Sequence, residues 1–333
     1  MARNNLKNVK KELLFYYESR MNPNGDPAFE NQPRLMPDGT IMVTDVRIKR
    51  TIRDYAKSKY GDTLFVDFGK DGKPVTADKQ AKEILGNLNG DVIKGLICKT
   101  FDAPLFGVLV TIRSDGKSKG GSQKLTGPVQ FAIGRSVNQV QILNPMISGR
   151  FVGKEKKKTT EEGVQDNDQK EEQFSTFGKF YAVEYALIKI QGAINPMNLG
   201  DYLDDPEVIE SFKEAEGKLA DCLWEGTNAL VTRSKFPQRS IFLLEVTYDS
   251  ALYNDLPLLV EENPCLREKV SCLTSSPLRF EKLISALSNR KQKVKNVGIA
   301  SCRELAKDAS QLMESIKALG IPVELIKTGE VSD

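Results

Sequence analysis

The sequence predicts an α+β protein built on a split βαβ, or ferredoxin-like, arrangement. An aromatic-rich apolar run at residues 12–20 is typical of a strand, and it ends before Pro23. Helical apolar spacing recurs at residues 43–55 and again at residues 204–230. Strand-like segments lie at residues 106–112, 129–133 and 241–248. The main elements therefore follow the order βαββαβ, which is also the order of the RRM fold, whose sheet presents RNA.

Other segments are expected around this core. A short strand is expected at residues 96–100 and a helix at residues 77–88. Residues 151–174 alternate blocks of charge without apolar periodicity, which predicts an exposed loop at the tip of a long hairpin. Two C-terminal helices, at residues 277–289 and 301–319, are expected to be joined by the basic link RKQKVKN.

Composition removes several classes of chemistry. The 333 residues include no histidine, which excludes His-based general bases, Ser-His-Asp and Cys-His nucleophile systems, and histidine metal ligands. The five cysteines are scattered without a CxxC pair, which argues against a cysteine zinc site. No signal-peptide pattern and no apolar run of membrane-spanning length is visible. We therefore expect a cytoplasmic protein without a membrane partner.

The net charge is only +3, but basic residues cluster in the first predicted helix. Residues 43–60 hold six Lys and Arg residues against two aspartates, and Thr44 is a plausible N-cap. Lys49 and Arg53 are four apart and share a helical face, with Arg50 beside them. Such a face suits a phosphate backbone. The alternative is a solvated helix face, which is the commoner role of a basic helix.

The loop before this helix is rich in polar turn residues. Asn22 and Asn24 could bond phosphate, ribose or base edges, and Arg34 follows them. The alternative is plain turn formation, which residue type alone favours. Asp26, Asp38 and Asp45 do not have the spacing of an EF-hand loop, so no metal and no cofactor are expected.

Two further cation groups lie at element ends, where loops commonly meet ligands. Arg135 and Ser136 interrupt one strand-like segment. A basic loop lies between the second long helix and the strand at residues 241–248. Its candidate residues are Arg233, Ser234, Lys235, Gln238 and Arg239.

Several of these segments together resemble a known family. The run NPNGDPAFENQPR followed by VTDVRIKRTIRDY resembles the opening of the Csh-type backbone subunit of type I, specifically I-B, CRISPR Cascade complexes, in the Cas-seven (DevR-like) branch of the RAMP superfamily. The likeness covers most of residues 13–248. It continues through LFG at 105–107, LTGPVQFAIGRS at 125–136, FGKFYAVEYALIKIQGAIN at 177–195 and LWEGTNALVTRSK at 223–235.

The resemblance implies one right-hand-shaped domain over residues 1–333. Its RRM-like palm would comprise about residues 10–57, 105–137 and 204–250, with a finger or edge insertion at about 58–104, a β-hairpin thumb at about 138–181 and C-terminal helices at about 276–320. Copies would polymerise head to tail along a CRISPR guide RNA and present it to a target DNA strand. Further partners would be the large, small and guide-end-capping Cascade subunits.

The resemblance also implies that the first helix and the basic loop hold RNA phosphates. Two thumb residues, Phe177 and Lys179, join the expected contacts. The sequence departs from the family pattern at Ile133, where an aromatic residue is common, and in the long charged insertion of the thumb. The expected RNA-binding residues are Asn22, Asn24, Arg34, Thr44, Lys49, Arg50, Arg53, Arg135, Ser136, Phe177, Lys179, Arg233, Ser234, Lys235, Gln238 and Arg239.

These observations favour a non-enzymatic RNA-binding scaffold, since base pairing can read sequence while the protein contacts the backbone. The alternative is a metal-dependent ribonuclease of the related type III kind, with Asp26 or Asp45 as catalyst. Asp45 is more simply explained as a helix cap. A small-molecule enzyme is a third possibility, but no motif supports it.

Overall fold

The structure is a computed structural model that describes residues 5–69, 72–88, 90–112, 121–144, 146–149, 176–179, 181–267 and 277–328. Its centre is an eight-stranded sheet in the order β18-β17-β14-β1-β13-β8-β4, in which β7 also pairs with β13. Strands β17 and β18 are parallel, and the other pairs are antiparallel. The strands are β1 (Val9–Ser19), β4 (Thr40–Val43), β7 (Val129–Phe131), β8 (Gly134–Gln139), β13 (Ala186–Ile194), β14 (Gln238–Asp249), β17 (Val294–Ser301) and β18 (Val323–Leu325).

Both long helices and the first and last strands of the predicted order are present, as α1 (Asp45–Tyr60), α5 (Pro206–Asn228), β1 and β14. The two middle strands differ from the prediction. Residues 107–112 form β5, which pairs with β6 (Gly121–Thr126) in a hairpin outside the central sheet, and residues 129–131 form β7, a short strand beside β13. In the sheet, β1 lies between β13 and β14, and β8 lies on the far side of β13. Strand β4 extends one edge of this set, and β17 and β18 extend the other. The result is a mixed α+β fold around one central sheet.

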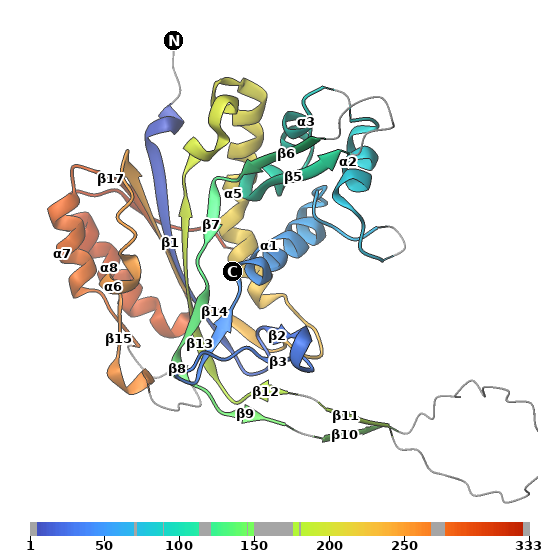
Figure 1. Ribbon diagram of the computed structural model, residues 1–333. Coiled ribbons are helices and arrows are strands. Elements are labelled where there is room, and N and C mark those ends of the chain that lie inside the picture. The colour runs from blue at the N-terminus through green and yellow to red at the C-terminus, as the bar shows by residue number, and fades with distance from the viewer. Residues whose placement is uncertain are drawn as a thin grey trace, which may run out of the picture.

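Both faces of the sheet are covered by helices (Figure 1). Along β1, Leu13, Phe15 and Tyr17 pack in the same core as α1 and α5. The alternate residues Leu14 and Tyr16 pack in a second core with α7 (Glu281–Arg290) and α8 (Ala306–Ala318). This alternation follows from the period of two in a strand. The aromatic run of β1 is therefore buried on both sides and is not open to a ligand.

Helices α1 and α5 lie against one another on the first face. Asp205 caps α5 and accepts hydrogen bonds from the backbone N–H groups of Glu207 at 3.0 Å and Val208 at 3.4 Å. A Cβ added to Gly226 would lie 3.1 Å from the Thr51 carbonyl oxygen. A glycine here therefore allows the end of α5 to approach α1 closely.

The insertion after α1 is more helical than the sequence suggested. The strand predicted at residues 96–100 is wrong, because Val92–Lys99 forms helix α3. Asp91 caps it by accepting from the Lys94 N–H at 2.9 Å, and Ile93, Leu96 and Ile97 are buried at helical spacing. The other elements here are α2 (Ala77–Leu85), α4 (Ala103–Phe106) and the hairpin of β5 (Gly107–Ile112) with β6 (Gly121–Thr126).

A narrow antiparallel ribbon leaves the body of the molecule after β8 (Figure 1). It consists of the pair β9 (Ile142–Leu143) with β12 (Ala182–Val183) and the pair β10 (Met146–Gly149) with β11 (Thr176–Lys179). The loop predicted at residues 151–174 lies outside the described residues.

The C-terminal third contains two helices, as predicted, but the link between them differs. Residues 294–301 form strand β17, which pairs with β14, so the predicted basic link is wrong. The basic residues at 290–295 are followed by an apolar stretch in which Val297 and Ile299 are fully buried. No described helix has the length and apolar character to cross a membrane. The remaining elements are β2 (Gly25–Asp26), β3 (Gln32–Pro33), α6 (Leu256–Leu259), β15 (Glu261–Glu262), β16 (Leu278–Arg279) and five 3-10 segments, Asn5–Asn8, Pro27–Phe29, Pro196–Asp204, Pro264–Arg267 and Arg303–Leu305.

Candidate nucleic-acid interface

Helix α1 places its cations around a buried apolar stripe that includes Ile48 and Ile52. Thr44 is the N-cap residue by backbone conformation, although its side chain makes no capping hydrogen bond. Asp45 is the first helical residue rather than the cap, which corrects the expectation from the sequence. Its carboxylate instead accepts a hydrogen bond from Lys49 Nζ at 3.1 Å.

Arg53 points into the protein. Its Nε donates to Asp102 Oδ2 at 2.7 Å, and the two side chains are only 10% and 1% exposed. Asp102 also accepts the backbone N–H groups of Phe65 at 2.7 Å and Val66 at 3.0 Å. A buried carboxylate needs such partners, because an unpaired charge there is strongly unfavourable. We therefore place Arg53 in the framework that holds the insertion, rather than among groups presented to RNA.

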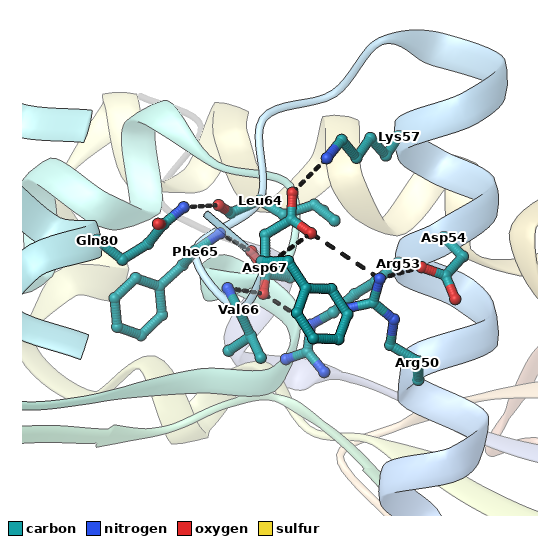
Figure 2. Close-up of polar contacts among 11 residues, drawn as sticks. Arg50, Arg53, Asp54, Lys57, Leu64, Phe65, Val66, Asp67 and Gln80 are labelled. Atoms are coloured by element: carbon teal, nitrogen blue, oxygen red, sulfur yellow. Dashed lines mark hydrogen bonds and ion pairs between the residues drawn. The ribbon is translucent and has the colours of Figure 1, made fainter. Parts of the chain in front are cut away.

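Arg50 and Lys57 also face the insertion. Figure 2 shows Asp67 between them, 2.5 Å from Lys57 Nζ and 3.8 Å from an Arg50 nitrogen. Arg50 also pairs with Asp54, one turn along α1, and its guanidinium lies 5.0 Å from the centre of the Phe68 ring. We call Arg50, Arg53 and Lys57 the paired cations, because each has a carboxylate partner.

Lys49 is likewise occupied. Besides Asp45, its Nζ donates to Gln130 Oε1 at 3.4 Å, and the side chain is 12% exposed. It lies 5.7 Å from the centre of the Phe106 ring, on which the Arg53 guanidinium also packs at 5.0 Å. These residues line one side of a surface cavity of about 560 Å³ between α1 and the β5–β6 hairpin.

The polar residues of the first loop mainly hold that loop together. The Asn22 side chain is buried and donates to the Asn31 carbonyl at 2.5 Å. Asn24 is also buried, and its side-chain donor is 3.5 Å from the Met42 carbonyl. Arg34 pairs with Asp26 at 3.4 Å. These contacts favour the turn-forming interpretation of the two asparagines.

The basic loop after α5, residues 229–237, lies directly against the first loop (Figure 1). The Asn22 N–H donates to the Ser234 carbonyl at 2.8 Å, and the Arg20 N–H donates to the Pro237 carbonyl at 3.4 Å. Two segments more than 200 residues apart in the sequence are thus adjacent. The fold brings together the loop before α1, the start of α1 and the loop after α5.

Two cations belong to these segments, Arg47 in the first turn of α1 and Lys235 in the loop after α5, and we call them the open cation pair. Arg47 donates to the Thr51 hydroxyl at 3.1 Å, and Lys235 donates to the Ser234 hydroxyl at 3.3 Å. Within the described part of the chain, no carboxylate lies within 4.0 Å of either cation. Burial lowers the pKa of the Lys235 ammonium, and repulsion by Arg47 lowers it further. Burial also lowers the pKa of Arg47, although Tyr17 and Asp54 oppose this effect.

Arg47 is one of the six Lys and Arg residues at positions 43–60, but it is absent from the residues that the sequence predicts to bind RNA. Its importance comes from Lys235, which is distant in sequence and close only after folding. The helical spacing offered one available signal, since Arg47 lies one turn before Arg50 and Thr51. Arg233 lies in the same loop and is exposed.

Arg135 and Ser136 lie inside strand β8 and do not interrupt a strand, which corrects the expectation that they lie at an element end. Both make internal contacts. Arg135 donates to Asp38 Oδ2 at 2.6 Å and to the Thr40 hydroxyl at 3.3 Å. The Ser136 hydroxyl is buried, accepts the Ile41 N–H at 2.8 Å and donates to a backbone carbonyl. Ser136 therefore joins β8 to β4 and faces no ligand.

Arg239 is held between two carboxylates. Its Nε lies 2.9 Å from Glu18 and its Nη1 lies 2.5 Å from Glu304. These bonds lower the pKa of Glu304 to about 2, with the hydrogen bond from Arg239 as the main cause. Gln238 starts β14 beside it and is half-buried. Phe177 and Lys179 lie on β11, and their side chains are outside the described part of the structure.

The three aspartates considered for metal binding are dispersed among other partners. Asp26 accepts the Ala28 N–H at 3.0 Å, Asp38 accepts from Thr40, and Asp45 pairs with Lys49. Among the described residues, no cluster of three or more Cys, Asp or Glu side chains could hold a metal ion. The described residues at the junction therefore offer cations rather than a cluster of carboxylates.

These features define an α+β protein with half-buried cations on α1 and on the loop after α5. The chain belongs to the CRISPR-associated protein Cas7 family, whose family model matches residues 9–271. It is 31% identical over 152 residues to a protein of Haloferax volcanii named CRISPR-associated protein Cas7, a match that covers 40% of this chain. The match spans 44% of that relative, so less than half of its length is shared.

Two solved structures are also similar over much of the chain. One is a chain of a CRISPR RNA-guided surveillance complex, pre-nicking, with a TM-score of 0.43 and 13% identity, covering 89% of this chain and 93% of that one. The other is a chain of a CRISPR RNA-guided surveillance complex, with a TM-score of 0.44 and 9% identity, covering 89% of each chain.

Proposed function

We propose that this protein is a guide-RNA-binding backbone subunit of a type I CRISPR effector complex, of Csh type in a I-B system. Family membership supports the general role. The single observation that carries the site is the open cation pair, Arg47 and Lys235, at the junction of three segments. Two partly buried cations without a carboxylate partner are electrostatically unfavourable, and a bound phosphate would relieve this.

In this proposal the strands β14, β1, β13 and β8 with α1 and α5 are the RRM-like palm, and the ribbon of β9 to β12 is the base of the thumb. Copies would assemble head to tail along the guide RNA in the cytoplasm. The guide would then pair with target DNA, and the large, small and guide-end-capping subunits would complete the complex. Base pairing supplies sequence specificity, so the protein needs only backbone contacts.

Co-expression with a CRISPR transcript tests the proposal. The purified particle is expected to contain RNA of one discrete length, protected by several protein copies. Guides of unrelated sequence should bind about equally, and affinity should fall steeply with salt. Purification free of nucleic acid, or affinity that depends on guide sequence, would contradict the proposed backbone contacts.

We also propose that the chain has no catalytic role. The dispersal of Asp26 and Asp45 among internal partners supports this. Incubation of the assembled particle with complementary RNA and magnesium is expected to leave that RNA intact. Regularly spaced cuts that disappear in Asp26→Asn or Asp45→Asn would establish the ribonuclease alternative instead.

A further inference from the structure

An exposed aromatic side chain lies directly beside the open cation pair. Phe236 follows Lys235 in the chain and is 54% exposed. The backbone N–H groups of Lys235 and Phe236 both donate to the Thr232 carbonyl at 3.2 Å, so one tight turn holds the two residues together. The proposed contact between Lys235 and a phosphate does not involve the Phe236 ring, so the exposure of this ring is unexplained.

The segment that carries the ring is basic and lacks acidic residues, which favours a nucleic acid over a protein partner. Residues 226–244 contain no Asp or Glu. A second exposed aromatic ring, Phe29 at 67%, belongs to the first loop, which is bonded to this loop between Asn22 and Ser234. Exposed rings beside backbone-binding cations form the surfaces that bind single-stranded nucleic acids, because every base has a face that can stack.

We propose that Phe236 stacks on an unpaired base of the RNA strand whose phosphate is held by Arg47 and Lys235. This inference rests on the proposed function and adds a second type of contact to the same loop. Lys235 binds the charged backbone, and Phe236 covers the face of the adjoining base without reading its identity. The loop after α5 thereby fixes where a base lies relative to its phosphate.

Another exposed ring provides a contrast within the chain. Phe68 is 51% exposed, close to the value for Phe236, but the Arg50 guanidinium already lies 5.0 Å from its centre. Arg50 in turn is paired with Asp54 and Asp67. Phe68 is therefore a matched control for the loss of an exposed phenyl ring away from the open cation pair.

The test measures the affinity of the wild-type protein, Phe236→Leu and Phe68→Leu for two RNAs. One is oligoadenylate, and the other is an abasic RNA of equal length and charge. Leucine keeps an apolar side chain but removes the stacking face. Phe236→Leu is expected to weaken binding of oligoadenylate by roughly 5- to 100-fold, the range for loss of one stacked base. It should leave binding of the abasic RNA unchanged, and Phe68→Leu should change neither.

The other outcomes separate this inference from the proposed function. If Phe236→Leu weakens the binding of both RNAs equally, or of neither, the stacking assignment is wrong. A loss of RNA binding in Lys235→Gln would still support the proposed phosphate contact in that case. If Phe236→Leu changes the mass of the assembled particle but not the ratio of the affinities for oligoadenylate and abasic RNA, Phe236 makes a protein contact. That result would overturn the inference. If wild-type protein binds neither RNA, the proposed function itself fails.

Discussion

The two sets of cations on and around α1 differ in what faces them. Arg50 and Lys57 pair with Asp67 of the insertion, and Arg50 also pairs with Asp54 on α1 itself (Figure 2). Arg53 pairs with the buried Asp102. Burial lowers the pKa of Lys235, and Arg47 at the start of the same helix lowers it further. Among the described residues, neither of these two cations has a carboxylate within 4.0 Å. The sixteen residues of this helix thus carry cations in two different electrostatic settings. The comparison teaches that a basic helix is not a binding surface until the partners of each cation are known.

The largest effect on stability is expected at Arg53, the buried member of the paired cations. Asp102→Asn removes the charge that Arg53 neutralises and weakens two backbone hydrogen bonds, so the free energy of unfolding should fall by about 3–5 kcal/mol. Urea unfolding measures this. Lys57→Gln is the control, because its side chain is 56% exposed and its pair with Asp67 should contribute at most about 1 kcal/mol. An equal loss of unfolding free energy in the two variants would show that the buried Arg53 pair contributes no more to stability than the exposed Lys57 pair.

The second effect concerns RNA binding by the open pair. Lys235→Gln is expected to reduce RNA affinity about tenfold, since a charged hydrogen bond contributes roughly 1.5 kcal/mol. The slope of log K against log salt should become shallower by about 0.7 for the lost phosphate contact. Binding titrations at several salt concentrations measure both quantities. Arg50→Gln serves as the comparison, and an equal or larger loss there would place the RNA on the paired cations instead.

A smaller effect of opposite sign is expected in stability. The pKa of Lys235 is lowered in the folded protein, so charging it opposes folding at all pH values below that pKa. Lys235→Gln should therefore unfold no more easily than wild type at pH 7, with a gain of at most about 1 kcal/mol. This gain should disappear as the pH rises toward about 10.4, the unfolded value for lysine. Urea unfolding at pH 7 and pH 10 measures the trend, and a less stable variant at pH 7 would contradict it.

The smallest effect is expected at the exposed pair of Arg239 with Glu304. The pKa of Glu304 is about 2 in the folded protein and about 4.3 when unfolded, so its contribution is present above pH 5 and is lost as pH falls toward 2. Because the Glu304 side chain is 50% exposed, Glu304→Gln should cost less than about 1 kcal/mol at pH 7. Acid titration of unfolding compares the variant with wild type. A constant difference between pH 7 and pH 3 would rule out this assignment.

Local patterns in the sequence predicted both long helices and the first and last strands, because these patterns depend on near neighbours. The apolar stripe of α1 and the cap and proline that begin α5 are examples. Local patterns did not predict that β13 and β8, rather than residues 106–112, would extend the central sheet from β1. The errors arose where tertiary context dominates. Residues 92–99 are apolar on several sides because they pack into the insertion as helix α3. Residues 294–301 form strand β17 because they pair with the edge of β14, which is distant in sequence.

The candidate site was predictable only in part for the same reason. The sequence indicates which loops are basic, and it drew attention to the loop after α5. It does not show that Asp102 binds Arg53 or that Arg47 lowers the pKa of Lys235, because these pairs are separated by 49 and 188 positions. Folding therefore determines which cations are occupied and which remain available.

The helical layers on both faces of the sheet limit where a ligand can reach the protein. Because Phe15, Tyr16 and Tyr17 stay inside the two cores, the aromatic run of β1 offers no ring on which a base could stack. If the chain binds a guide RNA as proposed, its contacts would come from groups outside these cores, such as the loop after α5. Such contacts would not require either core to open.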